Sequence, residues 1–98
     1  MNQVSAVLRR AANGYVHWCP ACEEMHILPD SWTFDGNLEK PTFQPSFKHE
    51  GGSTPGWCCH YVLTAGVLNF CSDCSHAMAG QSVPLPPIPA EHRDEAFQ

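Results

Sequence analysis

Charged residues, and basic residues in particular, are scarce in this 98-residue sequence. Only 15% of the residues are charged, and five Lys and Arg stand against ten Asp and Glu, which gives a formal net charge of −5. A surface that binds nucleic acid needs clustered Lys and Arg to contact the phosphates. The composition therefore argues against a nucleic-acid partner, and we interpret the pair Arg9-Arg10 as a solvated strand end.

Long apolar runs are also absent. No stretch approaches the ~18 apolar residues of a membrane span, and residues 1–14 lack the apolar core and cleavage site of an export signal. We therefore expect a cytoplasmic protein without a membrane partner. Thiols stay reduced in that compartment, so paired cysteines there bind metal more often than they form disulfides.

Proline, glycine and cysteine are abundant, with nine, seven and six residues. Ordering a chain of this length costs roughly 100–200 kcal/mol of conformational entropy. A domain this small can only just offset that cost by apolar burial, and it usually needs a further crosslink. We expect residues 1–86 to form one domain stabilised by zinc, and residues 87–98 to form a proline-containing, flexible tail.

The pattern of turns and short apolar segments predicts a mostly β fold. Residues 57–64 and 67–72 form a predicted β-hairpin around the two-residue turn Ala65-Gly66. The prolines of segment 40–47 exclude a helix there, and residues 51–56 read as a flexible loop. We expect a small zinc-ribbon-like domain with proline-rich loops and at most one or two short helical turns. The alternative is a small α+β domain with a helix over residues 73–80.

Two CxxC units predict a zinc site. Cys19-Pro-Ala-Cys22 follows a predicted strand, and Cys71-Ser-Asp-Cys74 repeats its spacing. Two thiolates with this spacing in a tight turn can both bind one tetrahedral ion. The hairpin register, with Tyr61 opposite Phe70, places Cys59 and Cys74 on one face and Cys58, His60 and Cys71 on the other. Two ligand sets follow: Cys19 and Cys22 with Cys59 and Cys74, or Cys19 and Cys22 with Cys71 and Cys74.

An ordered set of motifs over roughly residues 7–86 resembles a small phage and bacterial family. The motifs are Trp18-Cys-Pro-Ala-Cys22 with His26, residues 40–46 (KPTFQPS), Cys59-His60, residues 72–76 (SDCSH) and residues 79–85 (AGQSVPL). Members of that family are often uncharacterised or mislabelled ammonia monooxygenase. The family pattern has an apolar residue in place of Cys71 and no cysteine at Cys58. The resemblance therefore favours Cys19, Cys22, Cys59 and Cys74 as zinc ligands.

Relatives in this family lie in bacterial operons for ubiquitin-like conjugation and are proposed peptidases. The resemblance thus implies cleavage of a protein or peptide tail, which is ubiquitin-like in the related systems. A peptidase needs a nucleophile, a base and a group that orients the base. We expect Ser46 as nucleophile, His60 or His76 as base, and Asp73 as the orienting group.

Other interpretations of these residues remain open. Ser46 and Thr42 can bond to the backbone of a proline-rich turn, while the histidines support the metal as a ligand or in its surroundings. An open, catalytic zinc site with Glu23 or Glu24 as base is a further route. The alternative function is a non-catalytic zinc module that binds a host or phage protein through a surface that includes Trp32, Trp57 and Leu85.

Overall fold

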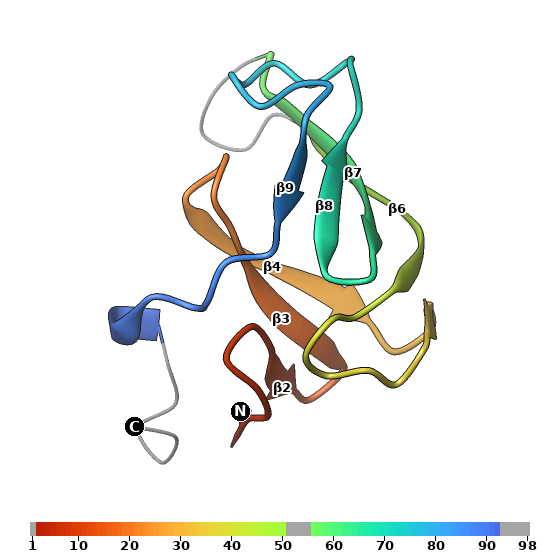
Figure 1. Ribbon diagram of the computed structural model, residues 1–98, viewed down its shortest axis with the longest axis vertical. Helices are drawn as coiled ribbons and strands as arrows, with labels where there is room; N and C mark the ends of the chain where they lie inside the picture. Colours follow the sequence, from red (N-terminus) through yellow and green to blue (C-terminus); the bar gives the residue numbers. More distant parts are fainter. Residues whose placement is uncertain (1, 51–55, 93–98) are drawn as a thin grey trace.

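The computed structural model describes residues 2–50 and 56–92, which form two antiparallel sheets (Figure 1). The first sheet has the order β1-β2-β3-β4, with β1 (Asn2–Gln3), β2 (Arg9–Ala11), β3 (Gly14–Cys19) and β4 (Glu24–Pro29). The second sheet has the order β5-β6-β7-β8-β9, with β5 (Thr33–Phe34), β6 (Phe43–Glu50), β7 (Cys58–Thr64), β8 (Val67–Phe70) and β9 (Ser82–Pro84). The prediction of a mostly β fold is confirmed.

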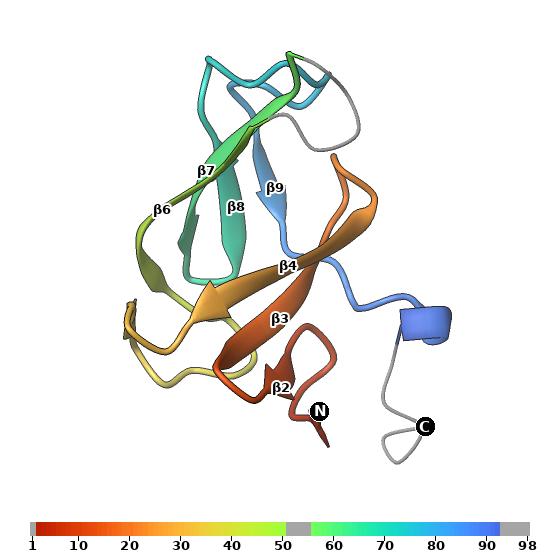
Figure 2. The ribbon, with the colours of Figure 1, turned by 180° about the vertical axis from the view of Figure 1, so that it is seen from behind.

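The two sheets enclose one core. Strands β3 and β4 run across the strands of the second sheet, as Figures 1 and 2 show from opposite sides. Strand β7 has a strict alternation of burial, with Cys59, Tyr61 and Leu63 buried and the residues between them more exposed. Because successive side chains of a strand point to opposite faces, the second sheet has an inner face in the core and an outer face toward solvent.

The β7–β8 hairpin has the predicted register. Thr64 pairs with Val67 and Tyr61 with Phe70. Both turn residues adopt positive φ angles, 49° at Ala65 and 77° at Gly66, as a two-residue hairpin turn of this type requires. This register and the burial of β7 confirm the prediction that Cys59 lies on the same face as Tyr61, with His60 on the opposite face.

Helical structure among the described residues is limited to one 3₁₀ turn, η1 (Ala90–His92). Residues 73–80 form a series of turns, so the α+β alternative is wrong. Pro84 ends β9, and Ile88 is fully buried and donates a backbone hydrogen bond to the Ala6 carbonyl. Ile88, two residues beyond the predicted domain end at residue 86, is therefore part of the core. Residues 51–55 of the predicted loop 51–56, and residues 93–98 of the predicted tail, lie outside the described residues.

Within the described part of the chain, no helix is long and apolar enough to cross a membrane.

Candidate active site and metal centre

Ser46 lies on an irregular segment of β6. Phe43 pairs with Leu63 and Phe47 pairs with Tyr61, so Gln44, Pro45 and Ser46 all stand opposite Val62. Such a bulge bends the strand and redirects the side chains that it carries. Phe47 stacks on Tyr61 at the inner face, and Ser46 lies on the outer face of the sheet.

Three of the predicted site residues meet on this outer face. Ser46 Oγ lies 3.2 Å from His60 Nε2, and His60 Nδ1 lies 3.2 Å from both carboxylate oxygens of Asp73. A carboxylate only accepts hydrogen bonds, so Nδ1 carries the hydrogen and Nε2 is free to accept the hydrogen of the Ser46 hydroxyl. The three side chains thus follow one another in the order that the nucleophile, base and orienting group of a serine hydrolase require. The His60 side chain is 24% exposed and that of Asp73 50% exposed, so the group is open to solvent.

His76 lies apart from this group. Its Nδ1 accepts a hydrogen bond from the backbone N–H of Met78, and its ring packs edge-on against Phe70 at 4.7 Å between centroids. Burial lowers the pKa of His76. Of the two candidate bases, the structure therefore brings only His60 to Ser46.

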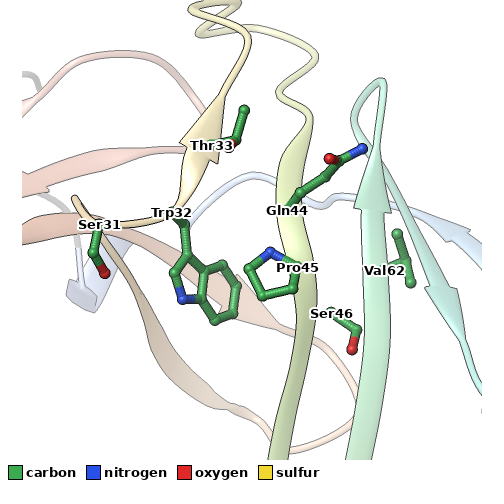
Figure 3. Close-up of a pocket in the computed structure, with 7 residues that line it drawn as sticks. All are labelled: Ser31, Trp32, Thr33, Gln44, Pro45, Ser46 and Val62. Atoms are coloured by element: carbon green, nitrogen blue, oxygen red, sulfur yellow. The ribbon is translucent and has the colours of Figure 1, made fainter.

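A pocket of about 400 Å³ opens beside Ser46. Figure 3 shows that β5, β6 and β7 contribute to it, with the rings of Trp32 and Pro45 next to each other and Val62 on the neighbouring strand. The pocket thus has apolar walls and several polar side chains. Its full lining is Ser31, Trp32, Thr33, Gln44, Pro45, Ser46 and Val62.

The first CxxC unit forms a tight turn between β3 and β4. The backbone N–H of Cys22 donates to Cys19 Sγ at 3.4 Å, and the N–H of Glu23 donates to the Cys19 carbonyl at 2.8 Å. Glu23 closes the turn with a φ of 54°. The turn directs the Cys19 side chain into the core, where Cys59 arrives from β7, and the two sulfur atoms lie 3.9 Å apart.

The Sγ atoms of Cys19, Cys22 and Cys59 all lie within 4.8 Å of one another, and none of these cysteines is in a disulfide. A hydrogen bond from the Cys59 thiol lowers the pKa of Cys19 to about 7, whereas burial raises the pKa of Cys22 to about 11. The contact with Cys19 and burial also raise the pKa of Cys59. Three thiols this close cannot all ionise without a cation between them. The donor set and its spacing fit a metal ion that prefers thiolates, such as zinc.

Two further residues are candidates for the fourth ligand of this cluster. Cys74 lies outside the three-sulfur group, and its Sγ contacts the backbone of His60, 3.0 Å from the carbonyl oxygen and 3.2 Å from the nitrogen. One ring nitrogen of His26 lies within 4.8 Å of both the Cys22 Sγ atom and a carboxylate oxygen of Glu24. Its buried Nε2 has no hydrogen-bond partner among the described residues, although Glu24 Oε1 is 3.5 Å away. Cys71, the ligand of the ribbon-like set, instead lies with His60 and Asp73.

Sequence reasoning missed a buried chain of hydrogen bonds near the cluster of Cys19, Cys22 and Cys59. His17 Nδ1 bonds to the Trp18 carbonyl, and His17 Nε2 meets the hydroxyl of Tyr61, which also lies 3.1 Å from His26 Nδ1. All three rings are buried. Strand alternation gives no signal for this chain of hydrogen bonds, because the adjacent residues Val16 and His17 are both buried.

Leu85, predicted to belong to a binding surface, lies in the core with 8% of its surface exposed, so that part of the surface prediction is wrong. Glu24, a candidate base in the alternative with an open zinc site, contacts the rings of His26 and His49.

Comparison with known proteins identifies one family. The model of the family "Bacterial ubiquitination-like system serine protease (BubE)" matches residues 1–71, which include Ser46, His60 and three of the four predicted zinc ligands. Neither the comparison with curated proteins nor that with solved structures gave a match.

Proposed function

Because the chain belongs to the BubE family of bacterial ubiquitination-like system serine proteases, we propose that it is a serine peptidase with Ser46 as its nucleophile. The observation that carries the proposal is the continuous hydrogen-bonded series Ser46–His60–Asp73 on one exposed face. We infer that His60 is the base, that Asp73 orients it and that His76 has a structural role.

The geometry supports the two proton transfers of acyl transfer. His60 Nε2 accepts the proton of Ser46 as Oγ attacks the scissile carbonyl, and it then donates that proton to the leaving amine. Asp73 holds the hydrogen on Nδ1 and stabilises the imidazolium that forms between these steps. Water hydrolyses the resulting acyl-enzyme by the same route, with His60 again accepting and returning one proton.

The pocket beside Ser46 favours a protein or peptide substrate. Its apolar walls, formed by Trp32, Pro45 and Val62, can hold one substrate side chain next to the scissile bond, and its polar groups can bond to the substrate backbone. The described residues around it present no cluster of Lys and Arg that would suit a nucleic acid. Together with the family, these features support the tail of a ubiquitin-like protein as the substrate class. We place this reaction in the bacterial cytoplasm, where such tags are conjugated.

We further propose that Cys19, Cys22, Cys59 and Cys74 hold a structural zinc ion. A zinc ion in a thiolate set is closed to substrate and supplies only stability. Cys59 directly precedes His60, and Cys74 directly follows Asp73. Fixing these two cysteines therefore fixes the backbone of the base and of its orienting group.

Substitution of the nucleophile tests the proposal. Ser46→Ala removes one hydroxyl, so zinc content and thermal stability should stay close to wild type. Cleavage of a ubiquitin-like protein carrying a C-terminal extension should fall by about 10⁴-fold or more, because the loss of a nucleophile removes the contribution of the whole triad. An active-site serine reagent such as a fluorophosphonate should modify Ser46 in the wild-type protein.

Two control variants separate catalysis from stability. Ser82→Ala removes an exposed hydroxyl of β9 that donates a hydrogen bond to Asn69 Oδ1, and it should keep full activity. His76→Gln keeps a polar group near Met78 and should also remain active. If Ser46→Ala cleaves as fast as wild type, the serine peptidase is wrong.

A further inference from the structure

Cys71 has no part in the proposed triad or in the buried metal centre, yet it lies beside both the base and its orienting group. It follows β8 directly, and its backbone N–H donates to the His60 carbonyl at 2.8 Å. One ligand atom each from His60, Cys71 and Asp73 lies within 4.8 Å of the other two. Thus a thiol, an imidazole and a carboxylate converge on the outer face of the second sheet.

These three groups can supply three of the four ligands that a zinc-like cation needs. Zinc binds thiolate sulfur at about 2.3 Å and imidazole nitrogen or carboxylate oxygen at about 2.0–2.2 Å, which puts neighbouring ligands about 3.5 Å apart. Side-chain movements of about 1 Å would reach that spacing from the present one. All three residues are partly exposed, so water can supply a fourth ligand.

We propose that a divalent cation of the zinc type binds reversibly to His60, Cys71 and Asp73 and switches the peptidase off. This proposal rests on the proposed function of Ser46 and His60. The cation replaces the hydrogen bonds between His60 Nδ1 and Asp73 with metal bonds. Cys71 Sγ releases its proton to solvent, and the hydrogen of His60 Nδ1 passes through solvent to Nε2. With Nε2 protonated, His60 cannot accept the proton of Ser46, so the nucleophile stays protonated.

The Asp73 carboxylate beside the Cys71 thiol favours a divalent cation at this site, because the cation displaces the proton of the thiol and offsets the charge of Asp73. This outer site is also more exposed and poorer in sulfur than the Cys19 cluster, so its cation should exchange more readily.

Zinc titration of the purified protein with its buried centre already filled tests the inhibition. Wild-type activity should fall as free Zn²⁺ rises and return on addition of a mild chelator. Cys71→Ser should keep activity without added metal but require much more zinc for the same inhibition. Loss of a group that only supports a ligand costs about 10–100-fold in metal affinity, so loss of the ligand itself should shift the titration by at least about tenfold. Cys58→Ser, which removes another cysteine of the same outer face, should behave as wild type.

Cobalt binding provides a readout that does not depend on activity. With zinc in the buried centre, one added equivalent of Co²⁺ should give a thiolate-to-cobalt charge-transfer band in wild type and in Ser46→Ala. The band should be absent in Cys71→Ser. An unchanged band in Cys71→Ser, or no band in wild type, overturns the outer site whether or not the protein is a peptidase. A band that depends on Cys71 in a protein without any Ser46-dependent cleavage supports the site and overturns the peptidase.

Discussion

Protonation of His17 should make the fold sensitive to acid. The imidazole is fully buried, with Nδ1 bonded to the Trp18 carbonyl and Nε2 to the hydroxyl of Tyr61. Burial, with a smaller contribution from His26, lowers its pKa from 6.5 to about 3. The folded protein therefore keeps His17 neutral at pH values where the unfolded chain already binds a proton.

The sign and size of the effect follow from this difference. Between pH 6.5 and about 3 the unfolded state binds the extra proton, so the free energy of unfolding falls as the pH falls. At pH 5 the loss is about 2 kcal/mol, because each pH unit below 6.5 contributes about 1.4 kcal/mol. Such a loss is a large fraction of the roughly 5–15 kcal/mol by which most domains are stable.

Urea unfolding between pH 7.5 and 5, in one buffer series with excess zinc, measures the slope. His17→Gln should be less stable than wild type at pH 7.5, but its stability should fall less steeply with acid, since glutamine does not titrate. Tyr61→Phe is the matched control: it removes the hydroxyl partner but leaves His17 buried, so the steep slope should persist at lower overall stability. Equal slopes in wild type and His17→Gln would refute the reasoning.

Four other substitutions test the proposed metal centre, its turn and the triad. Cys74→Ser should release zinc and unfold the protein, as measured by elemental analysis and circular dichroism; retained zinc there, with zinc lost from His26→Gln, would make His26 the fourth ligand. Glu23→Gly should raise the free energy of unfolding in urea by about 0.5–1 kcal/mol, because glycine adopts the φ of 54° without steric cost; lower stability would contradict this. Asp73→Asn should reduce kcat by about 10²–10⁴-fold at unchanged zinc content, since an amide favours the wrong tautomer of the base; an unchanged kcat would show that the base needs no carboxylate.

Much of the fold could be predicted from the sequence because its signals are local. The turn Ala65-Gly66 sets the register of β7 against β8, and strand alternation then assigns Cys59 to the inner face and His60 to the outer face. The CxxC spacing predicts a tight turn that carries two thiols, whatever the rest of the chain does. Family-like motifs added Ser46 and Asp73 as candidates, although they did not distinguish His60 from His76.

Only the tertiary structure decided which of these residues meet. The bulge in β6 places three residues opposite Val62 and so brings Ser46 within reach of His60. This effect depends on how β6 pairs with β7, which the residues of β6 alone do not determine. The crossing of the two sheets brings Cys59 rather than Cys71 to Cys19 and Cys22, and it buries His17 against Tyr61. A sequence pattern determines which face a side chain takes, because that depends on neighbours along the strand, whereas the packing of distant strands determines which side chains touch.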